Sequence, residues 1–573
     1  MTNARTLSRL LAVVLLFPTT VAIARQVPDF GLITNADGDN AFRAETLEES
    51  QRLLRAEVDG NADVGVKTFC YSIASGSEIM LYPTKVGSTW GWRKTKDDEK
   101  PEWGPRIDRN RRNMEAGGDG PRTVGEQAKK RGMYFLPSQR MNDGHYCFGT
   151  PPEEYPLTGR FWLENRDLVI KDSPVKARPE YGQLLDYSQE KVRNYRLAQA
   201  FEAMDRYQHL MDGYELDFTR FQIFFPAGKA WERRDLMTDV VRKIRQHLDE
   251  LGKANNKSYT LIARIPPAPH NCQWAGLDVA KWASDGLVDV IVPSQMMNMG
   301  FEQPIDQFVK IVEGTGVRVY AGLLPRVGWS WEFTPVDRPT VKDFGRPDRQ
   351  LSIPQLRAVA MSSQSQGANG LYLFNFAHYA TWGKVTSSPK AVRLAEPQTL
   401  AMQDQVYSIS KSYWYDNEDG YEYRKQLPET LTSGEAKTFK LLVGANVGDP
   451  KVRQALRRSI LRLGFRDIAP GMTLSVKVNG KEVLTDAADA AIATTDAADA
   501  ATAKILKGQK DLASHVVPIT LKDLSAIRQG QNEITVRART TTAAAGAKPL
   551  TLTDIDLGLF FGDADGAGAR VSR

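Results

Sequence analysis

The sequence predicts a (β/α)8 barrel followed by a smaller all-β domain of the sandwich type. Eight short apolar runs recur between residues 28 and 395, and helical segments separate most of them. After about residue 400 the pattern changes to apolar and polar residues that alternate with period two. A chain of 573 residues is also too long for one ordinary core. We therefore expect at least two domains.

The eight apolar runs have the length of β-strands. In order they cover 29–35, 65–72, 132–138, 212–218, 259–265, 288–294, 317–324 and 370–376. The expected helices include 46–59, 123–132, 188–207, 233–252, 276–286 and 304–316, most of which end at or next to a glycine, a common helix stop. An open doubly wound sheet is the rival fold, but it would have a glycine-rich phosphate loop after its first strand, and this sequence has none there.

The C-terminal part reads as a β-sandwich over residues 405–565. Its expected strands are 436–444, 472–480, 515–521, 532–539 and 550–561, with a hairpin turn at Asn479-Gly480. An alanine- and aspartate-rich insert covers 485–503. This composition predicts a loop or a mobile helix without chemistry of its own.

The first 24 residues have the pattern of a secretory signal peptide. Arg5 and Arg9 precede the apolar run LLAVVLLF, and the small residues of AIA (22–24) form a cleavage site before Arg25. The run is too short for a stable transmembrane span, and no later segment approaches the roughly 18 apolar residues that a span requires. We expect cleavage after Ala24 and a mature protein that is secreted or periplasmic, with no transmembrane segment.

Composition and motifs exclude several classes of function. The net charge of +6 comes from 75 basic and 69 acidic residues that are interspersed, so no nucleic-acid partner is expected. The three cysteines (Cys70, Cys147 and Cys272) form no disulfide framework, although one bridge is open to them. Neither they nor the six histidines have metal-ligand spacing, and there is no G-x-S-x-G elbow or P-loop. We expect no metal and no cofactor.

Two acids, Glu215 and Asp217, lie two residues apart in the fourth strand, DGYELDF. If the apolar residues that alternate with them face the helices, both acids face the barrel axis, with Asp217 nearer the C-terminal mouth and Glu215 deeper. Two buried carboxyls raise the pKa of at least one of them, which is how an enzyme obtains a general acid beside an ionised partner. The alternative is that one or both are structural and held by salt bridges, for example Glu215 by Arg264.

Other polar residues follow the remaining strands, where the mouth of a barrel lies. Arg140, Asn142, Asp143 and His145 follow the third strand and suit sugar binding or proton transfer, although Asn-Asp-Gly is also a good turn. Glu332 is the first choice for a second carboxylate because its apolar surroundings would raise its pKa; otherwise it is a solvated loop residue. The further candidates are Asp37, Asp39, Arg264, His270, Gln295, Asn298, Arg326, Asn375 and His378.

Five tryptophans lie in the segments that follow the second and seventh strands: Trp90, Trp92, Trp103, Trp329 and Trp331. Indole faces match the apolar faces of pyranose rings, so five on one rim favour a surface on which sugars stack. The alternative for any one of them is that it packs its loop against the barrel.

Two motifs carry a resemblance to a known family. DGYELDF followed by TRFQIFF, with RMNDGH upstream, resembles the glycoside-hydrolase-like TIM barrels of the family-10-like group of uncharacterised bacterial glycosidases, over residues 28–395. The strand is also similar to the D-G-x-D-x-D-x-E strand of family 18 chitinases. There Asp212, Gly213 and Asp217 match, Glu215 replaces an aspartate, and Thr219 takes the position of the catalytic glutamate, so substrate-assisted chitinase chemistry is not expected. The C-terminal part resembles the β-sandwich accessory modules of exported glycosidases.

These observations predict an exported glycoside hydrolase that acts on a poly- or oligosaccharide. Asp217 would be the nucleophile or general base, and a second carboxylate (Glu332, Asp143 or Glu215, in that order) would protonate the leaving oxygen. Substrate would be bound by Arg140, Asn142, His145, Arg220, Arg264, Gln295, Trp329, Trp331, Asn375 and His378. The arginines leave room for an anionic glycan. The rival from another class is a glycan-binding barrel at the cell surface that hydrolyses nothing.

Overall fold

Eight parallel strands close into a barrel in the order β1-β13-β10-β9-β8-β7-β6-β2. In chain order they are β1 (Leu32–Ala36), β2 (Val66–Ser72), β6 (Tyr134–Arg140), β7 (Gly213–Asp217), β8 (Thr260–Ile265), β9 (Val290–Pro293), β10 (Arg318–Leu323) and β13 (Gly370–Phe374). All eight coincide with the apolar runs of the sequence, because strands buried on both faces need apolar side chains throughout. The predicted barrel is confirmed.

This computed structural model describes residues 27–76, 78–101, 103–145, 152–175, 179–296, 299–328, 348–376, 393–410, 426–466, 472–487, 493–494, 515–540 and 550–562. Within these ranges, no helix is both long and apolar enough to cross a membrane. The signal peptide predicted for residues 1–24 and the cysteine at position 147 lie outside them, whereas Cys70 and Cys272 are buried free thiols.

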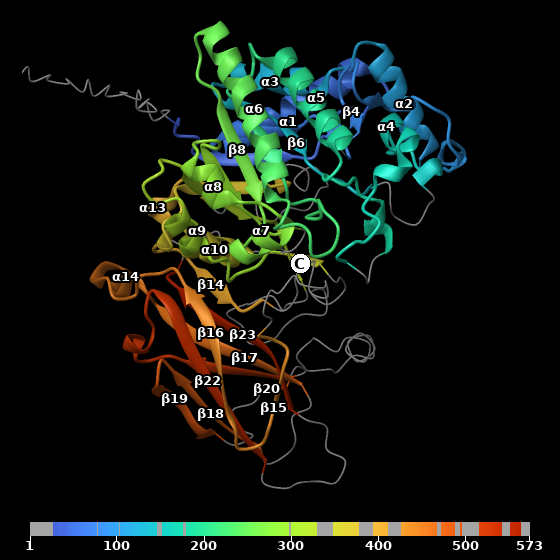
Figure 1. Ribbon diagram of the computed structural model, residues 1–573. Coiled ribbons are helices and arrows are strands. Elements are labelled where there is room, and N and C mark those ends of the chain that lie inside the picture. The colour runs from blue at the N-terminus through green and yellow to red at the C-terminus, as the bar shows by residue number, and fades with distance from the viewer. Residues whose placement is uncertain are drawn as a thin grey trace, which may run out of the picture.

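Helices surround the barrel and cover the outer face of its strands (Figure 1). The six predicted helices correspond to α1 (Leu47–Asp63), α3 (Gly120–Lys130), α5 (Glu190–Tyr207), α6 (Arg234–Asn255), α8 (Val279–Ser284) and α9 (Ile305–Ile311). Sequence reasoning missed α2 (Gly104–Glu115), α4 (Arg160–Glu164), α7 (Pro269–Ala275) and α10 (Ile353–Ser365). The start of α10 did carry a signal, because Ser352 and Gln355 form a capping box.

The tryptophans that follow β2 pack within their own insertion. Trp90 is only 2% exposed and lies under the guanidinium of Arg106, whose carbon is 5.3 Å from the ring centroid. The same guanidinium lies 5.3 Å from the ring of Trp103, and Trp92 donates its Nε1 hydrogen to the carbonyl of Thr158 at 3.2 Å. The expected sugar-stacking role is therefore wrong for Trp90. The two predicted tryptophans of the seventh loop, Trp329 and Trp331, lie outside the described residues.

The C-terminal domain contains two larger antiparallel sheets. One has the order β14-β23-β17-β21-β20, with β15 also pairing with β23, and the other has the order β16-β22-β18-β19. The strands are β14 (Gln405–Ser408), β15 (Glu429–Leu431), β16 (Ala436–Val443), β17 (Arg458–Arg466), β18 (Met472–Val478), β19 (Lys481–Ala487), β20 (Ala493–Thr494), β21 (His515–Thr520), β22 (Gly530–Thr540) and β23 (Leu550–Phe560). Side chains from both sheets share one apolar core, which confirms the predicted all-β domain.

The predicted hairpin is also confirmed, since Asn479 and Gly480 join β18 to β19 with φ of 50° and 82°. Positive φ at both positions is what a tight two-residue hairpin turn requires. Most of the alanine- and aspartate-rich insert predicted at 485–503 lies outside the described residues.

Helix α10 joins the barrel to the β domain. Gln355 donates its amide hydrogen to the hydroxyl of Ser408 in β14 at 3.3 Å, and Ala358 lies in the apolar core of the β domain. A second contact runs from the backbone N–H of Phe301, after β9, to the hydroxyl of Ser410 at 2.9 Å.

Gly444, directly after β16, approaches the backbone of α10 so closely that a side chain cannot be accommodated. A Cβ there would lie 2.3 Å from the carbonyl carbon of Met361 and from the nitrogen of Ser362. We expect Gly444→Ala to cost about 1–3 kcal/mol of stability and to expose the junction, because backbone on both sides must move. Urea unfolding and limited proteolysis measure this.

Gly60 in α1 is the matched control, because a Cβ there would meet nothing within 4 Å. Gly60→Ala should be neutral or stabilising by about 0.5–1 kcal/mol. If Gly444→Ala unfolds and is cleaved like the wild type, α10 is not a close-packed junction.

Candidate active site

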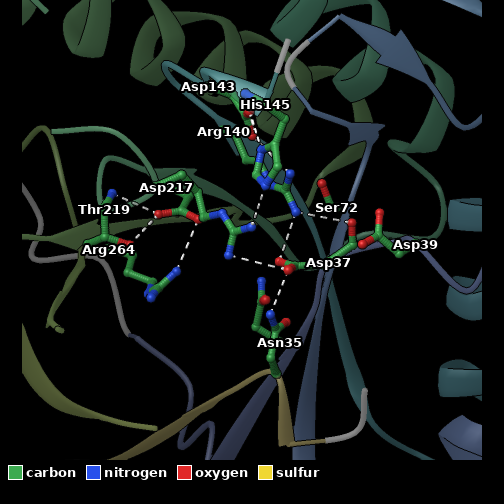
Figure 2. Close-up of polar contacts among 12 residues, drawn as sticks. Asn35, Asp37, Asp39, Ser72, Arg140, Asp143, His145, Asp217, Thr219 and Arg264 are labelled. Carbon is green, nitrogen blue, oxygen red and sulfur yellow. Dashed lines mark hydrogen bonds and ion pairs between the residues drawn. The ribbon is translucent and has the colours of Figure 1, made fainter. Parts of the chain in front are cut away.

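Three charged residues stand at one level where β6, β7 and β8 end. In the strand register Arg140 pairs with Asp217, and Asp217 pairs with Arg264. The neighbouring Tyr214 points the other way, since its hydroxyl donates to Gln139 on the helix side of β6. The predicted alternation along β7 is confirmed: Asp217 points toward Arg264 in the barrel mouth (Figure 2), and Glu215 contacts Asn35 of β1 and Tyr372 of β13 across the barrel interior.

Asp217 is held on both carboxylate oxygens and is 2% exposed. Its Oδ1 accepts hydrogen bonds from the backbone N–H and the hydroxyl of Thr219 at 2.9 and 2.7 Å. Its Oδ2 lies 3.1 Å from Nη1 of Arg264. The carboxylate therefore has one charged partner and two neutral donors, which fix its orientation at the end of β7 (Figure 2).

Arg264 is fully buried and spans three strands. Its Nη2 lies 3.3 Å from the hydroxyl of Ser294 and 3.3 Å from the carbonyl of Gln295, both after β9. Its guanidinium carbon is 3.6 Å from the centroid of the Phe374 ring in β13. The sequence offered Arg264 as a possible salt-bridge partner of Glu215, but in the structure Arg264 forms its ion pair with Asp217.

Glu215 lies deeper in the barrel, with no exposed surface. Its Oε1 accepts a hydrogen bond from the hydroxyl of Tyr372 in β13, and its Oε2 lies 3.4 Å from the amide nitrogen of Asn35 in β1. Loss of hydration raises the pKa of Glu215, and the negative charge of Asp217 raises it further. Glu215 therefore holds a proton more readily than an ordinary glutamate, but its carboxyl group is enclosed in the barrel interior.

Asp37, at the end of β1, is the centre of a second charged cluster. Its Oδ1 lies 2.9 Å from Nη2 of Arg140, and its Oδ2 lies 3.3 Å from Nη1 of Arg220. Asn375, whose φ is 56°, donates to the same Oδ2 at 2.5 Å. Arg140 completes the cluster through a 2.9 Å ion pair with Asp143. Sequence reasoning gave Asp37 only a supporting role, because an Asp-Gly turn is common.

His145 is the most solvent-accessible member of this cluster, with a side chain 31% exposed. Its Nδ1 contacts Oδ1 of Asp143, and its Nε2 lies 3.4 Å from Nη2 of Arg220. Burial by itself would raise the pKa of Asp143, but His145 and Arg140 outweigh it and hold that pKa well below its usual range.

Some of the remaining predicted residues are placed by the structure, and the others lie outside the described residues. Asn142 braces the mouth, because its amide donates to the carbonyls of Leu185 and Ile223 at 3.1 and 2.8 Å. Gln295 is 2% exposed, and its amide nitrogen has no hydrogen-bond partner within the described part of the chain. Glu332, Trp329, Trp331, Asn298 and His378 lie outside the described residues.

In the described ranges, no three histidine, cysteine, aspartate or glutamate side chains gather in a way that could hold a metal ion. The arrangement that is present consists of carboxylates, guanidinium groups and one imidazole. These groups can orient hydroxyls and stabilise charge at the mouth of a barrel.

The chain has distant structural similarity to glycoside hydrolases. It is 8% identical to an endo-1,4-beta-mannanase from Rhizomucor miehei, with a TM-score of 0.38 over 65% of this chain and 95% of that one. A maltogenic alpha-amylase from Thermotoga neapolitana is 12% identical, with a TM-score of 0.35 over 93% and 99%. A cycloisomaltooligosaccharide glucanotransferase from Paenibacillus sp. is 9% identical, with a TM-score of 0.30, and the chain spans only 57% of its length.

Similarity at this level carries no argument about fold, substrate or reaction; the barrel is shown by the strand order itself. No protein-family model matches the chain, and no curated protein sequence matches it. The resemblance to the family-10-like group therefore stays a prediction.

The buried ion pairs of Arg140 should contribute measurably to stability. Arg140→Met leaves the buried carboxylates of Asp37 and Asp143 with one partner fewer each, so we expect a loss of about 3–5 kcal/mol in the free energy of unfolding. Arg52→Met is the control, because Arg52 pairs with Glu49 on the exposed surface of α1 and its loss should cost less than about 1 kcal/mol. Urea denaturation measures the free energy of unfolding of both variants. Equal losses of stability in Arg140→Met and Arg52→Met would show that the cluster does not stabilise the mouth.

Glu57, a buried glutamate of α1, should make the stability of the protein depend on pH. Glu57 of α1 accepts a hydrogen bond from Asn40, which in turn accepts one from the hydroxyl of Tyr71 at 3.0 Å. Loss of hydration raises the pKa of Glu57 from 4.5 to about 7, against the opposing charge of Arg43 at 3.3 Å. Between these two values the folded protein binds more protons than the unfolded chain.

Stability should therefore fall as pH rises from about 4.5 to about 7, by on the order of 3 kcal/mol, and then level off. Glu57→Gln removes the titration and should flatten this part of the profile, while Glu49→Gln on the surface of the same helix should leave it unchanged. Denaturant unfolding at a series of pH values measures both. An unchanged slope in Glu57→Gln would contradict the prediction.

Proposed function

We propose that this protein hydrolyses glycosidic bonds at the C-terminal mouth of its barrel, with Asp217 as the nucleophile or general base. The observation that carries the proposal is the placement of Asp217 at the end of β7, oriented by Thr219 and Arg264. A carboxylate in a fixed orientation at a strand end is what attack on an anomeric carbon, or on a water beside it, requires. The neighbouring arginines and His145 supply donors for sugar hydroxyls.

The proton donor in this proposal is Glu332. Asp143 is the weaker choice because its lowered pKa keeps it ionised, and an ionised carboxylate has no proton to give. Glu215 has the raised pKa of an acid catalyst, but it is fully buried among groups of the barrel interior. Glu332 lies between Trp331 and Phe333 in the sequence, and apolar neighbours would raise the pKa of its carboxyl group as an acid catalyst requires.

The charge balance of the mouth favours a neutral sugar at the point of cleavage. Arg140 pairs with Asp37 and Asp143, Arg220 with Asp37, and Arg264 with Asp217. An anionic substrate group would have to compete with these carboxylates for every one of the three guanidinium groups. A neutral hydroxyl can instead share a donor without displacing a buried charge.

Burial favours the rival function, a glycan-binding barrel without hydrolysis. Asp217, Asp143 and Glu215 are each 2% exposed or less. A catalytic carboxylate must reach the substrate, so a barrel that keeps all three covered would bind glycan through its rim alone.

Export belongs to the same proposal, because a polysaccharide too large to be imported must be met outside the cytoplasm. The signal peptide read from residues 1–24 supports it. N-terminal sequencing of the mature protein from culture medium or periplasm should give Arg25 as the first residue. A full-length chain retained in the cytoplasm would remove this part of the proposal.

The test of hydrolysis is Asp217→Asn, assayed on a panel of neutral and anionic polysaccharides with product analysis. We expect kcat to fall by at least about 10²–10⁴-fold while glycan binding is kept, since the amide cannot act as nucleophile or base. Because Arg264 then loses a buried charge partner, thermal unfolding must show that the variant is folded. Thr219→Val removes only the hydroxyl donor, while the carboxylate of Asp217, its ion pair with Arg264 and the backbone donor of residue 219 remain, so this variant should lose far less activity.

Glu332→Gln is a second variant and should also lower kcat for substrates with poor leaving groups. Full activity in folded Asp217→Asn would exclude the assignment. Binding by the wild type without hydrolysis of any glycan would establish the rival function instead.

A further inference from the structure

A small pocket of about 170 Å³ lies beside the mouth, between the loop that follows β7 and helix α7. Gln222, Phe225 and Trp231 line it from the loop, and Gln273 and Trp274 line it from α7. Both segments follow the C-terminal ends of their strands, so the pocket is at the same end of the barrel as Asp217. It shares no residue with the charged clusters of the mouth.

The walls of this pocket are aromatic and uncharged. None of the described residues that line it carries a charge, in contrast to the mouth. Trp231 is 41% exposed, which sets it apart because large apolar residues of the described chain are otherwise buried or half-buried, with Met402 as the other exception.

The exposed indole of Trp231 is nevertheless held in place. The guanidinium carbon of Arg234 lies 4.8 Å from its ring centroid, and Nη1 of Arg234 donates to its backbone carbonyl at 2.8 Å. Arg234 is itself anchored by an ion pair of 3.4 Å with Asp278, at the start of α8. A tryptophan that is exposed and also oriented is suited to stacking on a ligand ring.

Gln222 is the second, independent observation. It is 1% exposed, and neither its Oε1 nor its Nε2 has a hydrogen-bond partner within the described part of the chain. Native proteins rarely leave a buried amide unsatisfied, because each lost hydrogen bond costs about 1–3 kcal/mol. A group that both donates and accepts, as a hydroxyl does, would satisfy both atoms of this amide.

We propose that this pocket binds one neutral sugar ring of the glycan on which the barrel mouth acts. Trp231 stacks on the apolar face of the ring, and the amide of Gln222 exchanges hydrogen bonds with its hydroxyls. The described lining residues carry no charge, which favours a neutral ring over a uronic or sulfated one, and the volume suits one ring because sites for larger ligands have roughly 300–1,000 Å³. The inference rests on the proposed function for the glycan, but not on the hydrolysis step.

The test uses the full chain with Asp217→Asn, so that any bound glycan stays intact. Neutral hexasaccharides of glucose, mannose, xylose or N-acetylglucosamine are titrated calorimetrically. We expect one of them to bind, with affinity lowered on the order of tenfold by Trp231→Ala and by Gln222→Leu. Met402→Ala is the matched control, because it removes the other exposed apolar side chain and should leave affinity unchanged.

Gln222→Leu also separates ligand binding from a structural role. Leucine has a similar volume and no unsatisfied polar atoms, so the variant should unfold at the same temperature as the parent or higher while it binds more weakly. If affinity and thermal stability instead fall together in both pocket variants, Gln222 and Trp231 serve the fold and the proposal is overturned.

The outcomes distinguish this inference from the proposed function. Hydrolysis by the wild type with unchanged KM and binding in both pocket variants overturns the pocket and leaves the function standing. Binding that depends on Trp231, without hydrolysis by the wild type, keeps the pocket and overturns the function. Failure of all four hexasaccharides to bind the Asp217→Asn protein overturns the pocket.

Discussion

The ion pair between Asp217 and Arg264 is the constraint on which the mouth of the barrel depends. Both side chains are buried, and neither charge could remain there alone without a large loss of stability. Arg264 also bonds to the end of β9 and stacks on Phe374 of β13, so the pair links adjacent strands to the far side of the cylinder. The geometry of the carboxylate is therefore set by the closure of the barrel itself.

The same requirement for charge balance explains the cluster around Asp37. Arg140 and Arg220 bring two positive charges to the mouth, and Asp37 and Asp143 neutralise them across β1 and β6. An imidazole then lies at the more accessible end, beside Asp143. Such a network is rigid, and rigidity is what a site needs to hold hydroxyls in one orientation without reorganising when substrate arrives.

Strand periodicity was enough to predict the barrel and the inward direction of Glu215 and Asp217. Successive side chains of a strand point to opposite faces, so once the apolar residues of β7 are assigned to the helix side, both acids must face the barrel axis. It could not predict the partners, since the sequence distances from Arg264 to the two acids are nearly the same and only the register places Arg264 opposite Asp217. The central strand β17 was missed because its buried positions run without alternation. Helix α10 was missed because it carries little amphipathic contrast, being buried on one side by the barrel and on the other by the β domain.

The mouth and the pocket beside it differ in charge: the mouth holds buried ion pairs, and the described residues that line the pocket carry no charge. In the mouth, each described carboxylate has an arginine, a tyrosine or an amide as its partner, so the free energy of burial is already compensated there. A few residues beyond Asp217, the amide of Gln222 is buried without such compensation, beside an oriented and exposed indole. Because a protein gains nothing from an orphaned amide in its unliganded state, affinity for the glycan would come from the uncharged pocket, while the charged mouth would supply orientation.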